Sequence, residues 1–215
     1  MGDLIYFMEK RILRVVLEGC PHSGKSAVSG FLKNLSAMIP VALVDEAATD
    51  ILQVKPNFLA EDPIAFQKNV LMMQYQREEE AFRFCQKRME EEGFSLGMVI
   101  VDRGAADAYV YLDDQTAAEI CHMTLDELLS RYDYVFHFDP YLGGTSLQDG
   151  NDVRAEKNTD EIFERHRNSL AVWSQHSHFE TIPVFETKEE KVRYVISRLH
   201  AIAGEEVFEI PVLVS

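Results

Sequence analysis

Near the start of the chain lies an eight-residue segment whose residue types and spacing could bind phosphate groups. Residues 19–26 read GCPHSGKS and match the pattern G-x-x-x-x-G-K-[ST] in full. Backbone N–H groups of such a loop surround the phosphates of a nucleotide, and the N-terminus of the following helix adds a favourable field. Lys25 is expected to reach the β- and γ-phosphates, and the Ser26 hydroxyl is expected to hold Mg²⁺. The predicted nucleotide-binding residues are Gly19, Cys20, Pro21, His22, Ser23, Gly24, Lys25, Ser26 and Ala27.

Carboxylates follow two other apolar segments of the chain. Asp102 comes directly after residues 97–101, where a nucleotide enzyme needs a ligand for Mg²⁺ or a group that orients water. An exposed aspartate that caps the next helix is the alternative. Asp45 and Glu46 follow residues 41–44. We predict that Glu46 lies on the acceptor side and takes the proton of an attacking hydroxyl, whereas helix capping by Asp45 is a competing explanation.

Arginines could neutralise the charge that phosphoryl transfer spreads over the phosphate oxygens. Arg103 stands beside the predicted metal ligand, although a structural ion pair is an alternative for it. Arg154 lies in a polar segment, and Arg165 and Arg167 follow it. Because Arg165 and Arg167 are two apart on a predicted helix, they cannot both face one site.

The composition narrows the class of protein. A length of 215 residues favours one domain, and a net charge of −15 argues against a nucleic-acid-binding surface. The three cysteines, Cys20, Cys85 and Cys121, are far apart and lack the spacing of zinc or redox motifs. His137 is interpreted as a packed histidine, because no cysteine or second histidine lies at metal spacing nearby. We also expect no membrane segment and a cytoplasmic location, because residues 4–8 are too short for a signal core.

Five apolar runs have the length of strands and alternate with segments of helical periodicity. They are Ile12–Leu17, Val41–Val44, Met98–Val101, Tyr134–Phe138 and Thr181–Phe185. This alternation predicts a parallel sheet covered by helices on both faces, a three-layer α/β/α fold.

Local signals mark the ends of several helices. The longest is predicted to begin after Asp62, with Pro63 in its first turn, and to end before Gly93. Its second half is rich in charged residues, which we interpret as a solvated face. Capping boxes predict two further helix starts, at Thr124 with Glu127 and at Thr187 with Glu190.

Two segments have no predicted helix or strand. Residues 139–160 form a polar loop that follows a predicted strand and contains Arg154, so we interpret them as a lid, with a surface insertion as the alternative. Residues 205–215 form an apolar C-terminal extension. It could add an edge strand or pack against a second copy of the chain in a homodimer.

The chain resembles the P-loop nucleoside and nucleotide kinase-like proteins, and within them the AAA-type ATPase-like family that includes ribosylnicotinamide kinase domains. The resemblance spans about residues 11–200 and is carried by GCPHSGKS, VDEAATDI (44–51), VIVDRGAADAYVY (99–111), YDYVFHFDP (132–140) and DGNDVRAE (149–156). It implies five parallel strands in kinase-like order, a mobile lid after the fourth strand, an acceptor-side base at Glu46, and phosphate contacts from Arg103 and Arg154. His22 replaces a glycine common in such loops, and the lid is poorer in arginine than in nucleoside monophosphate kinases, which weakens the case for a nucleotide acceptor.

The function expected from these features is transfer of the γ-phosphate of Mg²⁺–ATP to a hydroxyl of a small, nucleoside-like metabolite. The predicted catalytic residues are Lys25, Glu46, Asp102, Arg103 and Arg154, and the predicted metal ligands are Ser26 and Asp102. A GTPase switch is disfavoured, because the chain has neither Asp-x-x-Gly after the third strand nor Asn-Lys-x-Asp. An ATPase coupled to a protein partner, or a regulatory nucleotide-binding protein, is the alternative.

Overall fold

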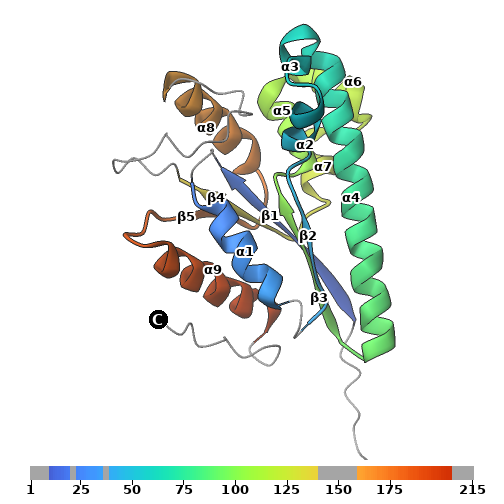
Figure 1. Cartoon of the computed structure of the whole chain (residues 1–215), viewed down its shortest axis with the longest axis vertical. Helices are drawn as coiled ribbons and strands as arrows, with labels where there is room; N and C mark the ends of the chain where they lie inside the picture. Colours follow the sequence, from blue (N-terminus) through green and yellow to red (C-terminus); the bar gives the residue numbers. More distant parts are fainter. Residues whose placement is uncertain (1–9, 20–22, 36–38, 140–158, 205–215) are drawn as a thin grey trace, which may run out of the picture.

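The computed structural model describes residues 10–19, 23–35, 39–139 and 159–204. Their strands form one sheet, in which every neighbouring pair is parallel and the order is β2-β3-β1-β4-β5 (Figure 1). The strands are β1 (Arg11–Gly19), β2 (Val41–Val44), β3 (Leu96–Asp102), β4 (Tyr134–Phe138) and β5 (Phe179–Ile182). The predicted five-stranded parallel sheet is confirmed.

Helices cover both faces of this sheet (Figure 1). On one face lie α1 (Lys25–Leu35) and α9 (Lys188–Ala203). On the other lie α4 (Pro63–Glu92), η1 (Ala105–Asp107), α5 (Ala108–Tyr111), α6 (Asp114–Cys121), α7 (Leu125–Leu129) and α8 (Thr159–Trp173). Two short helices, α2 (Ala47–Val54) and α3 (Phe58–Glu61), connect β2 to α4. The predicted three-layer arrangement is therefore confirmed.

The apolar strand sequences explain why two cores form. Successive side chains of a strand point to opposite faces of its sheet. In β1, Val15 and Leu17 therefore pack in the core beneath α1 and α9, whereas Val16 packs in the core beneath α4 and α8. All residues of β3 except its last are buried, as expected for a strand covered on both faces.

The long helix α4 begins and ends where its local signals predict. The Asp62 carboxylate accepts a hydrogen bond from the N–H of Ala65, and Gly93 closes the helix with φ 80°. Both predicted capping boxes, at α7 and α9, are also formed. The interpretation of the charged half of α4 as a solvated face is wrong at Glu78, which is fully buried beneath Arg131 and Tyr132.

The last strand begins and ends earlier than predicted. We expected residues 181–185, but β5 is Phe179–Ile182. Pro183 has no N–H to donate to the neighbouring strand, so the ladder ends before it. Residues 140–158 of the predicted lid, with Arg154, lie outside the described residues, as do the C-terminal extension and residues 20–22 of the phosphate loop. The last two residues of the predicted lid belong to α8, so this helix begins earlier than expected.

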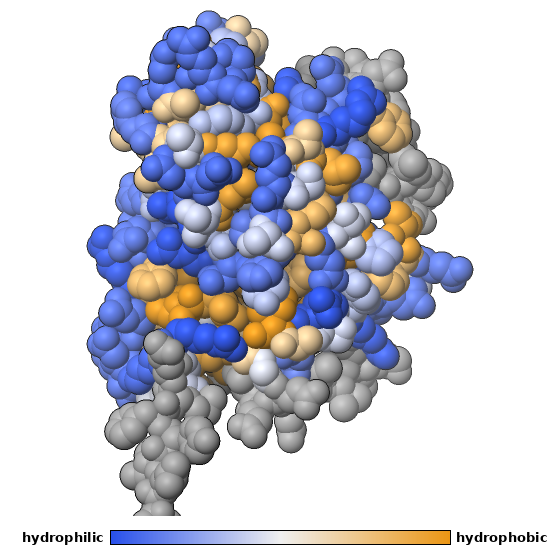
Figure 2. All heavy atoms as spheres, turned by 180° about the vertical axis from the view of Figure 1, so that it is seen from behind, coloured by the Kyte–Doolittle hydropathy of each residue, from blue (hydrophilic) through white to orange (hydrophobic). Residues whose placement is uncertain are grey.

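Among the described helices, none combines the length and apolar character needed to cross a membrane. Hydrophilic and hydrophobic residues are interspersed over the face turned away from the viewer in Figure 1, as Figure 2 shows.

Candidate active site

The phosphate loop lies at the centre of the sheet, at the carboxyl end of its strands. It begins at the end of β1, which pairs with β3 on one side and β4 on the other, and it leads into α1. Ligands of open α/β sheets bind at this edge. Gly19 has φ +127°, and a Cβ atom there would lie 2.4 Å from the carbonyl oxygen of Phe138. Only glycine lets the loop leave β1 so close to β4.

Two lysines bind the backbone of the phosphate loop. Nζ of Lys25 donates to the carbonyl oxygen of Gly19 at 2.6 Å. Nζ of Lys191, in the first turn of α9, donates to the carbonyl oxygen of Ser23 at the same distance. Both lysines are buried, whereas Ser26 is exposed. Sequence reasoning missed Lys191, because nothing in its local sequence distinguishes it from Lys188, the other lysine of that helix.

Asp102 lies beside the loop, because β3 and β1 are neighbours and Asp102 is in register with Leu17. Its Oδ1 atom is buried and has no hydrogen-bond partner among the described residues. Burial raises the pKa of this carboxyl group, while the positive charges of Lys25 and Arg103 oppose the rise. An unpartnered buried carboxylate oxygen fits a ligand for a hard cation, so Asp102 and the Ser26 hydroxyl are suitable to hold Mg²⁺.

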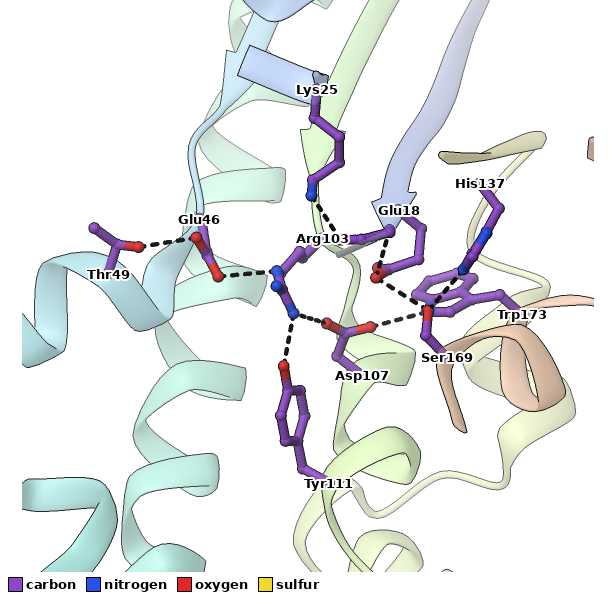
Figure 3. A network of polar contacts seen from close by, with 11 residues as sticks. Glu18, Lys25, Glu46, Thr49, Arg103, Asp107, Tyr111, His137, Ser169 and Trp173 are labelled. Carbon is purple, nitrogen blue, oxygen red and sulfur yellow. Dashed lines mark hydrogen bonds and ion pairs between the residues drawn. The ribbon is translucent and has the colours of Figure 1, made fainter. Parts of the chain in front are cut away.

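Arg103 is the centre of a charged network (Figure 3). Its guanidinium forms an ion pair with Glu46, with Nε 2.9 Å from Oε1, and a second with Asp107 at 3.5 Å. It also donates to the hydroxyl of Tyr111 at 2.7 Å. The structure thus brings together Glu46 and Arg103, which the sequence predicts as site residues from two different strand ends. In this structure the guanidinium lies against carboxylates, the ion-pair alternative raised for it above.

Glu46 is held from both sides. While Oε1 faces Arg103, Oε2 accepts a hydrogen bond from the Thr49 hydroxyl at 2.8 Å. The positive charge of Arg103 and the hydrogen bond from Thr49 both favour the ionised carboxylate, the form that accepts a proton. Asp45, the competing residue, is exposed.

Next to Asp107 of this network lies a further buried carboxylate, that of Glu18. Glu18 is only 1% exposed, and its Oε1 accepts hydrogen bonds from the Gly19 N–H at 2.8 Å and from the Ser169 hydroxyl at 3.2 Å. Asp107 accepts from the indole N–H of Trp173 at 2.8 Å. Burial, with the nearby Glu18 carboxylate as the next cause, raises the pKa of Asp107 well above its usual range. Glu18 was not predicted, although a glutamate in an apolar strand directly before the loop is a usable signal.

Of the three later arginines, Arg165 approaches this network. Its guanidinium lies 4.8 Å from the ring centre of Tyr111, which bonds Arg103. Arg167 is exposed, in agreement with the expectation that the two cannot both face the site. Arg154 lies outside the described residues.

The sequence was also compared with known proteins and protein families. A comparison with curated proteins finds no significant match to this chain. A family model described as an AAA domain matches residues 14–191, from β1 to the first turn of α9. The matched region contains the phosphate loop, Asp102 and the Arg103 network. Since it spans well over half of the chain, the protein belongs to the AAA domain family of P-loop NTPases.

Proposed function

We propose that the protein is an Mg²⁺–ATP-dependent phosphotransferase that phosphorylates a hydroxyl group of a small, nucleoside-like metabolite. This proposal rests on the position of the Glu46 carboxylate, which is fixed by an ion pair with Arg103 and a hydrogen bond from Thr49. Arg103 directly follows Asp102, so this carboxylate lies next to the residues suited to bind the metal and the triphosphate. A fixed, ionised carboxylate in this position suits a group that orients and deprotonates an acceptor.

Each residue then has a defined role in the transfer. Lys25 and the N–H groups of the phosphate loop hold the triphosphate, and Ser26 and Asp102 hold the metal ion, which supplies charge neutralisation when bound. Glu46 orients the acceptor hydroxyl and accepts its proton as that oxygen bonds to the γ-phosphorus. The bond to the bridging β–γ oxygen breaks, which leaves ADP and the phosphorylated acceptor. Arg103 keeps Glu46 ionised and in place, and Arg154 is proposed to contact the phosphates.

The family match also favours a second candidate. An AAA domain could hydrolyse ATP with water as the acceptor and couple hydrolysis to a protein partner. In that case a fixed Glu46 would orient water rather than a metabolite.

The test is ADP release from Mg²⁺–ATP with and without a panel of nucleosides, ribosylnicotinamide and nucleoside monophosphates. Stimulation by one acceptor, abolished in Lys25→Ala, supports the kinase. Turnover that ignores every acceptor but rises with a protein partner would replace it by the second candidate.

A pair of neighbouring variants tests the role of Glu46. Glu46→Gln should lower kcat by about 100-fold or more, the usual loss for a general base, with little change in ATP affinity. Asp45→Asn is the matched control, because Asp45 is adjacent in sequence but exposed. Equal activity of the two variants would remove Glu46 from the mechanism.

A further inference from the structure

Two histidines and an aspartate meet beyond the end of β4. His137 belongs to β4, Asp139 follows it, and His166 lies in α8. One potential ligand atom from each residue lies within 4.8 Å of those of the other two. Nε2 of His166 is 3.8 Å from Oδ1 of Asp139, and the two imidazole ring centres are 5.1 Å apart. Although no second histidine lies near His137 in sequence, the fold brings His166 next to it.

The hydrogen bonds of His137 identify which nitrogen can act as a ligand. The Ser169 hydroxyl has one proton, which it donates to Glu18, so it acts as acceptor toward Nε2 of His137 at 3.1 Å. Nε2 therefore carries the ring proton. With the proton on Nε2, the Nδ1 atom of the neutral ring has a free lone pair.

The lone pair of His137 Nδ1 accepts no hydrogen bond from the described residues. His137 is 0% exposed, and its Nδ1 atom is buried without a hydrogen-bond partner in the part of the chain described. The chain from imidazole N–H to hydroxyl to carboxylate is the outer arrangement that orients metal-binding histidines in proteins. Packing alone does not require the His137 ring to be fixed in this way, whereas binding of a metal ion by its Nδ1 atom does.

The separations suit a small transition-metal ion. A metal–nitrogen distance of about 2.1 Å places tetrahedral ligand atoms about 3.4 Å apart. The three ligand atoms lie within 4.8 Å of one another, and Nε2 of His166 is 3.8 Å from Oδ1 of Asp139, so the side chains must close in by about 1 Å to bind an ion. We propose that His137, Asp139 and His166 bind a divalent transition-metal ion of the Zn²⁺ type.

This site differs in chemistry from the predicted Mg²⁺ site. Two imidazoles and one carboxylate favour Zn²⁺, Co²⁺ or Fe²⁺, whereas Mg²⁺ prefers oxygen ligands only. Three protein ligands leave at least one coordination position for water or an anion. The proposal does not depend on the phosphotransferase function, because none of its three residues has a proposed role in phosphoryl transfer.

The test is titration of the chelator-treated full chain with Co²⁺, followed by its visible absorption, and displacement by Zn²⁺. We expect saturation at one ion per chain, displacement by Zn²⁺, and no displacement by Mg²⁺ in large excess. Asp139→Asn and His166→Asn should each weaken Co²⁺ binding by about 100-fold, since even loss of an outer-shell partner costs 10- to 100-fold. Circular dichroism establishes that each variant is folded, and both positions avoid the fully buried strand residue His137.

A surface histidine provides the matched control. His122 is exposed and has φ 52°, a conformation that asparagine tolerates, so His122→Asn should bind Co²⁺ as the natural protein does. Absence of saturable binding, or binding that the Asp139 and His166 variants leave unchanged, would overturn the proposal.

Discussion

Arg103 shows how a single residue links the two halves of the site. Its φ of 67° lies in the left-handed region, which non-glycine residues adopt only where the surroundings compensate. Three contacts supply that compensation, namely the carboxylates of Glu46 and Asp107 and the hydroxyl of Tyr111. The next residue, Gly104, has no room for a side chain, because a Cβ atom would lie 2.5 Å from Trp173. The sequence Asp-Arg-Gly therefore combines a proposed metal ligand, an ion-pair centre and a glycine in close contact with α8.

At the same scale, the carboxyl group of Asp107 should make stability depend on pH. Its pKa in the folded protein is raised well above the ordinary value of 3.8 by burial and by Glu18. Between 3.8 and the folded pKa, the folded state thus binds more protons than the unfolded state. The contribution of Asp107 to stability is present at low pH and is lost as pH rises through that interval. Asp107→Asn removes this dependence, so the variant should gain stability relative to the natural protein as pH rises.

The measurement is urea unfolding of both proteins at several pH values from about 5 to 8, where the difference in free energy of unfolding can change by at most about 1.4 kcal/mol per pH unit. Asp113→Asn is a poor control because hydrogen bonds from the Thr116 N–H and hydroxyl lower the pKa of Asp113, so that its removal would itself change the dependence of stability on pH. Asp126→Asn, at an exposed position in α7, is better suited. A difference between Asp107→Asn and the natural protein that stays constant with pH would contradict the prediction.

At the scale of elements, a buried polar chain fixes η1 against α4. The Tyr132 hydroxyl accepts a hydrogen bond from the Ala105 N–H at 2.7 Å and donates to Glu78 at 2.9 Å. Arg131 neutralises the same carboxylate at 3.1 Å. Because Ala105 begins η1, this chain sets the position of the turn that carries Asp107.

Tyr132→Phe should therefore destabilise the protein by about 1–3 kcal/mol, because it leaves the Ala105 N–H and a Glu78 oxygen buried without that partner. Chemical unfolding gives the free energy. Tyr109→Phe is the matched control, since its hydroxyl bonds the Met123 carbonyl in a more exposed position and should cost less. Losses of equal size would show that the buried chain has no special role.

The elements themselves were largely predictable, because their signals are local. Asp62, Pro63 and Gly93 mark the ends of α4, and Thr124 with Glu127 starts α7 through contacts three residues apart. The Glu78 contact with Tyr132 joins residues 54 positions apart, and periodicity alone could not distinguish it from surface charge. The approach of His137 to Ser169 was equally hidden, because it depends on how α8 packs against β4.

At the scale of the whole molecule, the last described helix is tied to the first loop. Lys191 of α9 and Ser23 of the phosphate loop are 168 positions apart in sequence, and the Nζ to carbonyl distance is 2.6 Å. The side chain of Lys191 also lies 3.2 Å from where a Cβ atom of Gly24 would be. Chain folding through α9 is therefore part of forming the nucleotide site.

Lys191→Met should reduce the affinity for ATP by about 10-fold, because the loop loses a charge-assisted hydrogen bond worth about 1.5–3 kcal/mol while the aliphatic stem still packs. The free energy of unfolding without nucleotide should change by less than about 1 kcal/mol, since burying the ammonium group costs nearly what its bond contributes. Burial also lowers the pKa of this lysine, in keeping with that cost. Lys188→Met is the matched control, an exposed lysine one turn earlier in α9. Nucleotide titration by calorimetry compares the two variants, and equal ATP affinities would show that α9 does not position the loop.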